Sequence, residues 1–220
     1  MKAGSERLVS IPSGSALLEG MLEMPPAAQG VVLFAHGSGS SRHSPRNNFV
    51  AAQLRKAGLA TLLIDLLTVE EDRDHERRFD IALLVERLHD AVRWLAAEAA
   101  TRGLPVGLFG ASAGAAAALQ LAAAVPSKVA VVVSRGGRPD LAGIVSLKRV
   151  KAPTLLIVGG DDTEVLALNE DAYAHLACRK SLFVVQGATH LLEEPGTLEI
   201  AASHAAGWFT QHLVPEAVRP

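Results

Sequence analysis

Cysteine, charge of one sign and long hydrophobic runs are all scarce in this sequence. A single cysteine, Cys178, excludes an internal disulfide and a multi-cysteine metal cluster. Because no helix N-terminus or basic cluster activates it, we interpret Cys178 as a packing residue rather than a nucleophile. The formal net charge of −2, with lysine and arginine scattered along the chain, offers no basic surface for nucleic acid.

No apolar stretch approaches the roughly 20 residues that span a bilayer, and no signal-peptide pattern is present, so we expect a cytoplasmic protein without membrane contact. We also expect no metal and no other cofactor, because His36, His43, His75 and His89 do not have ligand spacing on one element. Hydrophobic residues are abundant, at 49% of 220 positions, which is enough for the core of one domain over residues 1–220.

These hydrophobic residues form short apolar runs that alternate with longer helical patterns. The alternation predicts an α/β fold, with a mostly parallel twisted sheet and helices on both faces. The expected strands are residues 8–11, 17–24, 31–35, 60–66, 106–109, 129–134, 154–158 and 182–185. The expected helices are residues 45–57, capped by Ser44, then 80–100, 115–124, 164–176 and 198–212. A solvated loop is expected over 70–78, and residues 135–152 leave room for at most one brief helix.

The pentad Gly110-Ala111-Ser112-Ala113-Gly114 is the most informative motif of the chain. It stands between a predicted strand and an alanine-rich helical segment. A serine at such a sharp strand-to-helix turn is held in a strained conformation, and the flanking glycines let the backbone double back. Composition alone would produce a G-x-S-x-G pattern about one time in ten, so the prediction of a nucleophile depends on its partners.

A serine nucleophile needs a base to take its proton and an acid to orient that base. Asp161-Asp162 and then His190 each follow a predicted strand. Singly they have ordinary interpretations, since Asp162 could cap the next helix and a loop histidine is usually a surface residue. The order serine, acid, histidine predicts a catalytic triad of Ser112, Asp162 and His190. Asp162 is favoured over Asp161 because Val165, three residues further on, would then return to the core.

Two backbone amides are expected to form an oxyanion hole. One belongs to Ala113, the residue after the nucleophile, at the start of a helix whose dipole favours negative charge. The other is assigned to Ser38, in the small-residue loop 36–41 after the first buried strand. The same loop begins a dinucleotide-binding G-x-G-x-x-G pattern, but Arg42 stands at the third glycine position and would block close helix packing.

These features together resemble the α/β-hydrolase superfamily over essentially the whole chain. The resemblance is carried by His36-Gly37, the turn at Ser112, the acid Asp162 and the base in Gly187-Ala188-Thr189-His190. The compact build, Glu193-Glu194-Pro195-Gly196 and Asp65-Leu66-Leu67-Thr68 are similar to bacterial dienelactone hydrolase-like proteins. Some of those proteins are fused to a phosphoribosyltransferase domain, which we do not expect here. Dienelactone hydrolase itself uses a cysteine nucleophile, so the resemblance implies the fold and the triad but does not imply lactone substrates.

The segment 135–152 is too short for the helical lid that many relatives insert there, so we expect an open, shallow site. These features predict a serine hydrolase that cleaves short-chain or activated esters, thioesters or lactones through an acyl-enzyme. Two alternatives stay open: acyl transfer by the same triad to another acceptor, and a non-catalytic fold that only binds a ligand. The natural substrate is not determined, and we expect a monomer or a homodimer.

Three arginines are expected near the mouth of the site. Arg42 lies on the loop after the first buried strand, and Arg135 and Arg138 follow the strand 129–134. All three leave the carboxyl ends of strands, where open α/β sheets bind ligands, and a guanidinium fork matches a carboxylate. They could recognise an anionic substrate, although pairing with nearby acids such as Asp140 is slightly favoured.

Overall fold

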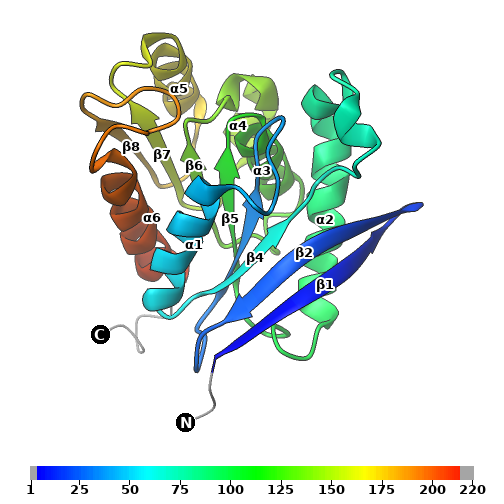
Figure 1. Ribbon diagram of the computed structural model, residues 1–220. Coiled ribbons are helices and arrows are strands. Elements are labelled where there is room, and N and C mark those ends of the chain that lie inside the picture. Colours follow the sequence, from blue (N-terminus) through cyan, green and yellow to red (C-terminus); the bar gives the residue numbers. More distant parts are fainter. Residues whose placement is uncertain (1–3, 214–220) are drawn as a thin grey trace.

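A computed structural model describes residues 4–213, and an eight-stranded sheet runs through its centre (Figure 1). The strands are β1 (Ser5–Ser13), β2 (Ala16–Met24), β3 (Val31–Ala35), β4 (Ala60–Ile64), β5 (Val106–Ala111), β6 (Val131–Arg135), β7 (Thr154–Gly159) and β8 (Lys180–Val185). Their spatial order is β1-β2-β4-β3-β5-β6-β7-β8. Strands β3 to β8 pair in parallel, whereas β2 pairs antiparallel with both β1 and β4. The expected α/β sheet is therefore confirmed.

Helices cover both faces of this sheet. One face carries α1 (Pro45–Lys56) and α6 (Thr197–Leu213), and the other carries α2 (Ile81–Ala97), α3 (Ala113–Ala124), α4 (Ile144–Arg149) and α5 (Thr163–His175). Three short 3₁₀ turns complete the elements: η1 (Glu71–Arg73), η2 (Arg77–Phe79) and η3 (Pro139–Ala142). No helix within residues 4–213 is both long and apolar enough to cross a membrane.

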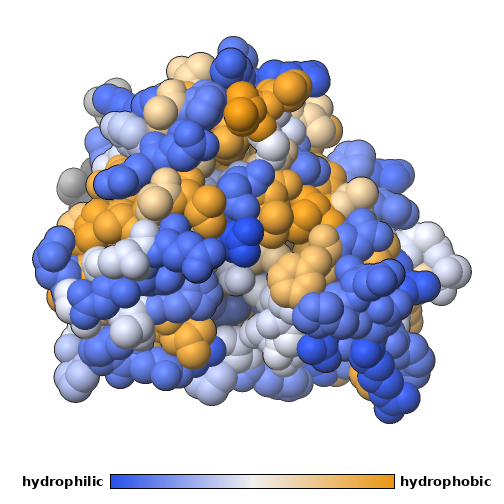
Figure 2. Space-filling view, turned by 90° about the horizontal axis from the view of Figure 1, so that it is seen from above, coloured by the Kyte–Doolittle hydropathy of each residue, from blue (hydrophilic) through white to orange (hydrophobic). Residues whose placement is uncertain are grey.

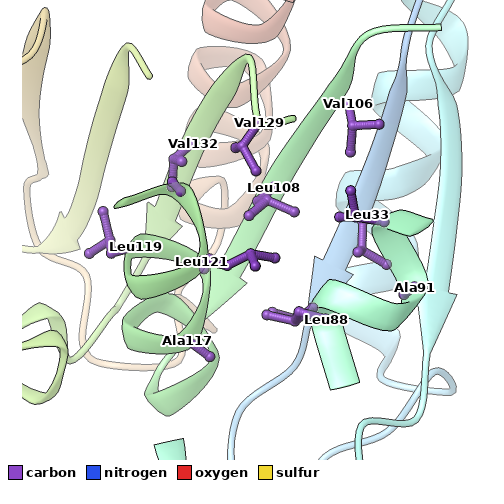
Figure 3. Packing of buried hydrophobic residues seen from close by; sticks show 14 of the residues in the cluster. Leu33, Leu88, Ala91, Val106, Leu108, Ala117, Leu119, Leu121, Val129 and Val132 are labelled. Carbon is purple, nitrogen blue, oxygen red and sulfur yellow. The ribbon is translucent and has the colours of Figure 1, made fainter. Parts of the chain in front are cut away.

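The central strands are buried on both faces, which explains why they read as continuous apolar runs rather than alternating ones. In Figure 3, Leu33 of β3 and Leu108 of β5 lie opposite Leu88 of α2 and Leu121 of α3. On the other face the rings of Phe34 and Phe109 lie 4.8 Å apart, within the core that α1 and α6 cover. Burial of these side chains is the main force that holds the helices to the sheet.

The predicted strands and long helices are all present, with most ends shifted by only a few residues. Some boundaries were wrong. Strand β6 ends at Arg135, so this arginine is the last residue of a buried strand rather than part of a loop. The loop expected over 70–78 contains η1 and the start of η2, and 135–152 contains both η3 and α4 instead of one brief helix.

Segment 135–152 nevertheless belongs to the body of the molecule. Leu147 of α4 and Ala142 of η3 are buried in the core that α2 and α3 share. The described segment therefore packs beside α3 instead of forming a helical cover over the carboxyl edge of the sheet.

Candidate active site

Ser112 lies between β5 and α3 in a backbone conformation that is rare for a residue with a side chain, at φ 49° and ψ −126°. A Cβ atom on Gly110 would lie 2.4 Å from the Ala115 Cα atom. One on Gly114 would lie 2.2 Å from the Ala35 carbonyl oxygen. Neither position has room for a side chain, and the sharp turn expected from the pentad is present.

His190 and Asp162 meet through their side chains, with His190 Nδ1 2.7 Å from Asp162 Oδ2. Asp162 stands at the N-cap position of α5, yet its carboxylate makes no capping hydrogen bond. The cap interpretation of Asp162 is therefore wrong, because this carboxylate is directed to the imidazole. Val165 is buried, as expected if Asp162 faces the histidine.

Ser112 and His190 line one pocket of about 240 Å³. The pocket opens at the carboxyl edge of the sheet, the upper edge in Figure 1, and Figure 2 views the molecule from that side. Hydrophobic and hydrophilic patches alternate on this face (Figure 2). The remaining lining residues are Gly37, Ser38, Ser40, Ser44, Arg46, Asn47, Ala111, Arg135, Gly136 and Leu191.

The loop after β3 packs directly against Ser112. A Cβ atom on Gly37 would lie 2.9 Å from the Ser112 Cβ atom, so only a bare backbone fits here. Ser38, the next residue, lines the pocket. Ala113 begins α3, and the first N–H groups of a helix have no acceptor inside it. Of the two residues predicted to supply oxyanion-hole amides, Ala113 directly follows Ser112 in the chain and Ser38 lines the same pocket as Ser112.

His36 anchors that loop with both of its ring nitrogens. Its Nε2 accepts the Leu66 backbone N–H at 2.9 Å, and its Nδ1 lies 2.9 Å from the Gly37 carbonyl oxygen. This pattern assigns the ring proton to Nδ1. Burial lowers the pKa of His36 below its ordinary value, so the imidazole is neutral in the folded protein.

The loop after β6 is fixed from two sides. Arg138 donates its backbone N–H to the Ser112 carbonyl oxygen at 3.1 Å. Asn169, a fully buried residue of α5, donates its side-chain amide to the Gly137 carbonyl oxygen at 3.0 Å. Gly136 is thereby held against His190. Asn169 could not be identified from the sequence, because nothing in the sequence shows which loop a polar side chain of a helix will contact.

Two of the three predicted substrate-binding arginines are paired with acids. The Arg42 guanidinium contacts the Asp65 carboxylate and lies 2.6 Å from Glu19 Oε2. Arg138 donates to both oxygens of Asp140, at 2.9 and 2.7 Å. That hydrogen bond raises the pKa of Arg138. Arg42 and Arg138 are therefore paired with nearby acids, which is the interpretation that the sequence slightly favoured.

Arg135 is different. Its residue is 8% exposed and its side chain lines the pocket. The Nη2 atom lies 3.5 Å from Asn47 Oδ1, while Nε and Nη1 are buried without a partner in the described part of the chain. Burial, with a smaller contribution from the like charge of Arg46, lowers the pKa of Arg135 to about 10.

Arg46 and Asn47 also belong to this pocket, although the sequence prediction missed them. Arg46 Nη1 lies 2.6 Å from Glu193 Oε1, and Arg46 Nε is buried without a partner among residues 4–213. One sequence signal could have identified these two residues. Ser44 was predicted to cap α1, and its hydroxyl does accept the Asn47 backbone N–H, which places the first turn of this helix at the carboxyl edge of the sheet.

A second pocket of about 250 Å³ adjoins the first at Ser40. It is lined by His36, Ser40, Ser41, Asp65, Leu67, Thr68, Val69, Asp72, Arg73 and Arg78. Within the residues that the structure describes, no group of three or more histidine, cysteine, aspartate or glutamate side chains could hold a metal ion.

The chain is similar to known proteins over most of its length. Residues 28–205 match the family described as "Alpha/beta hydrolase domain". The chain is 57% identical over 205 residues to a Mycobacterium tuberculosis H37Rv protein named "Putative phosphoribosyl transferase", covering 93% of this chain and 46% of that protein. It thus spans about half the length of the curated relatives that it matches.

Solved structures are similar as well. The dienelactone hydrolase of Anabaena variabilis ATCC 29413 is 54% identical, with a TM-score of 0.92 over 96% of this chain and 100% of that one. A cold-adapted esterase from an Arctic intertidal metagenomic library is 20% identical, with a TM-score of 0.79 over 96% of this chain and 95% of that one. At that identity the second likeness concerns the fold alone.

Proposed function

This chain belongs to the alpha/beta hydrolase family, with a dienelactone hydrolase-like fold, and from that premise we propose that it is a serine hydrolase of small esters. The observation that carries the proposal is one pocket that holds both a strained serine and a histidine paired with a carboxylate. A protein that only bound a ligand would have no use for a nucleophile in a costly backbone conformation.

In this proposal Ser112 Oγ attacks the carbonyl carbon of the ester while His190 Nε2 takes the serine proton. Asp162 accepts a hydrogen bond from the Nδ1–H group of His190, which leaves Nε2 free as the base and stabilises the imidazolium once it forms. The negative charge moves to the carbonyl oxygen, where the Ser38 and Ala113 backbone amides stabilise it.

The tetrahedral intermediate then collapses, and the bond to the leaving alcohol breaks as His190 gives that oxygen its proton. The product is an ester between Ser112 and the acyl group. A water molecule attacks this acyl-enzyme with His190 again as the base, and the acid product leaves as the Ser112 hydroxyl is restored.

The size of the pocket favours small substrates. Its volume of about 240 Å³ lies below the roughly 300–1,000 Å³ of sites that enclose drug-sized ligands. Most of the pocket residues are small or polar, and few of them offer apolar surface to a long acyl chain. Short acyl groups, activated esters and thioesters fit such a pocket.

A fluorophosphonate probe tests this proposal, because it reacts covalently only with an activated serine. We expect the unchanged protein and Ser127→Ala, a variant of an exposed serine in the turn between α3 and β6, to be labelled. Ser112→Ala should not be labelled. Absence of labelling at every pH between about 6 and 9, where a histidine base is competent, would show that the proposal is wrong.

Acyl transfer is the second candidate, since an acyl-enzyme can react with an amine or a thiol in place of water. Product analysis of hydrolysis with competing acceptors separates the two outcomes. The transferase activity named for the Mycobacterium tuberculosis relative concerns a protein of which the matched region is 46%, so we do not assign that activity to this pocket.

A further inference from the structure

The second pocket, which adjoins the Ser112 pocket, takes no part in the proposed chemistry. Its volume is about 250 Å³, and Ser40 lines both pockets. The two pockets are neighbours along the carboxyl edge of the sheet, because Ser112 follows β5, the loop with Ser40 follows β3, and Asp65 follows β4. A molecule held at Ser112 can therefore extend past Ser40 into the second pocket.

The charges that line the second pocket balance one another. Asp65 and Asp72 contribute two negative charges. Arg73 and Arg78 contribute two positive charges. His36 adds none, because burial lowers the pKa of its imidazole. A cation would meet two guanidinium groups here and an anion would meet two carboxylates, so the wall favours neither. The ligand class that this balance favours is neutral and polar.

The wall offers both hydrogen-bond donors and hydrogen-bond acceptors. Ser40 Oγ and Arg78 Nη1 form no hydrogen bond with any described residue. The Thr68 hydroxyl accepts the Glu71 backbone N–H at 3.2 Å, which leaves its own hydrogen free to donate. In the described chain, Asp72 Oδ2 accepts only Arg78 Nη2, at 3.3 Å, and retains free lone pairs. A hydroxyl group both donates and accepts, so it matches this mixed wall.

The rim of the second pocket indicates which part of an ester it suits. Val69 is 70% exposed and Arg73 is exposed as well, so the pocket opens outward. In the proposed reaction the acyl group stays bonded to Ser112 until water attacks, whereas the alcohol must leave first. A pocket that opens to solvent and meets the Ser112 pocket at Ser40 lets the alcohol leave without passing the acyl-enzyme.

We propose that the second pocket binds the alcohol part of the ester and that this alcohol carries further hydroxyl groups, as glycerol does. This inference rests on the proposed ester hydrolysis and adds the class of the alcohol. Ser40, Thr68 and Arg78 form hydrogen bonds with those hydroxyl groups. Leu67 and Val69 offer apolar surface to the carbon chain. The volume suits an alcohol of few carbons, since drug-sized ligands need roughly 300–1,000 Å³.

Glycerol monoacetate and propyl acetate form a matched pair, because they release the same acid and their alcohols differ only in two hydroxyl groups. Acetate release measures hydrolysis, with Ser112→Ala as the background. We expect the unchanged protein to prefer glycerol monoacetate by about tenfold in kcat/KM. Ser40→Ala and Thr68→Val should each reduce that preference about twofold to tenfold, through the loss of one hydrogen bond.

Two control variants accompany this measurement. Thr68→Ser keeps a hydroxyl group and should keep the preference, which separates a lost hydrogen bond from lost packing. Ser127→Ala, in the exposed turn between α3 and β6, should leave both rates unchanged. Equal rates of the unchanged protein on the two acetates, or a preference that survives both Ser40→Ala and Thr68→Val, would overturn the hydroxyl subsite while leaving the hydrolase in place.

A second pair of esters, methyl glycerate and methyl propanoate, places the hydroxyl groups on the acyl side. If the protein prefers methyl glycerate but not glycerol monoacetate, the assignment of this pocket to the alcohol is wrong.

Binding of glycerol monoacetate to Ser112→Ala, measured by ligand-observed NMR, tests the subsite without catalysis. We expect binding that weakens when Thr68→Val is added. If neither acetate is hydrolysed but this binding depends on Thr68, the subsite stands and the proposed function fails. Glycerol phosphate is the competing anion, and tighter Thr68-dependent binding of it than of glycerol monoacetate would overturn the choice of a neutral ligand.

Discussion

Two polar clusters adjoin the loop 36–44, and they differ in how completely their groups are paired. In the anchored cluster, formed by His36, Arg42 and Asp65, both ring nitrogens of the histidine and both charges of the arginine–aspartate pair have partners, and only Arg42 Nε is buried without one in the described chain. In the open cluster, formed by Arg46, Asn47 and Arg135, three guanidinium nitrogens are buried without one in the described chain.

Paired buried groups stabilise one arrangement of a fold, whereas unpaired ones cost stability until something binds them. The anchored cluster fixes the loop that supplies Ser38, and the open cluster faces the pocket that contains Ser112. If this distinction is correct, substitutions in the first should affect stability and substitutions around the pocket should affect activity.

The largest expected effect tests the expectation that substitutions around the pocket lower activity without changing stability. Asp162→Asn should lower kcat by roughly 10⁴-fold, because an amide cannot hold His190 in the required tautomer. Its free energy of unfolding should change little. Asp161→Asn, the matched control one residue earlier, should retain at least about a third of the activity. A larger loss in Asp161→Asn than in Asp162→Asn would mean that the acid is misassigned.

The next largest effect compares the two clusters by making the same arginine-to-glutamine substitution in each. Arg42→Gln should lower the free energy of unfolding by about 1–3 kcal/mol, because it leaves the partly buried Asp65 carboxylate without its cation. Arg135→Gln should leave that free energy unchanged or raise it, since it removes a buried charge that has no ion partner. Urea denaturation measures both. Equal destabilisation by the two substitutions would break the distinction between the clusters.

The smallest effect concerns pH. Burial holds the pKa of His36 below about 6.5 in the folded protein, so between the two values only the unfolded chain binds the proton. The stability that neutral His36 contributes is therefore present above about pH 6.5 and is lost as the pH falls, by at most about 1.4 kcal/mol per pH unit.

The measurement is the stability of the unchanged protein relative to His36→Gln at a series of pH values. The other histidines are common to both proteins and cancel in the difference. We expect the advantage of the unchanged protein to shrink from about pH 7.5 to pH 5. A constant difference over that range would contradict the assignment of His36 as a buried neutral group.

Local signals allowed most of the fold to be predicted from sequence. Apolar runs located the strands, the Ser44-Pro45 pair located the start of α1, and the pentad located the turn at Ser112. The position of Val165 even separated Asp162 from Asp161 in the direction that the side-chain geometry supports. All of these depend on spacing within a few residues.

Pairing between residues that are distant in the sequence could not be predicted from such local spacing. Arg42 and Asp65 are 23 positions apart, and Arg46 and Glu193 are 147 apart. The three arginines looked equivalent in the sequence because each follows a strand, and only the fold separates the unpaired Arg135 from Arg42 and Arg138. The same limit hid Asn169, whose acceptor on Gly137 lies 32 positions away.

The distribution of the pocket along the chain also governs how the site can form during folding. Its residues lie at or after the ends of β3, β5, β6 and β8, from Gly37 to Leu191, and parallel neighbours in a sheet bring together residues that are far apart in sequence. Such long-range pairing is formed late and slowly, because loop closure must precede its stabilisation. The β1–β2 hairpin contributes no residue to the pocket, and helix α1 contributes only Arg46 and Asn47. Catalysis by this chain would therefore be an all-or-none property of the completed sheet, and recovered activity would count only molecules that have finished folding.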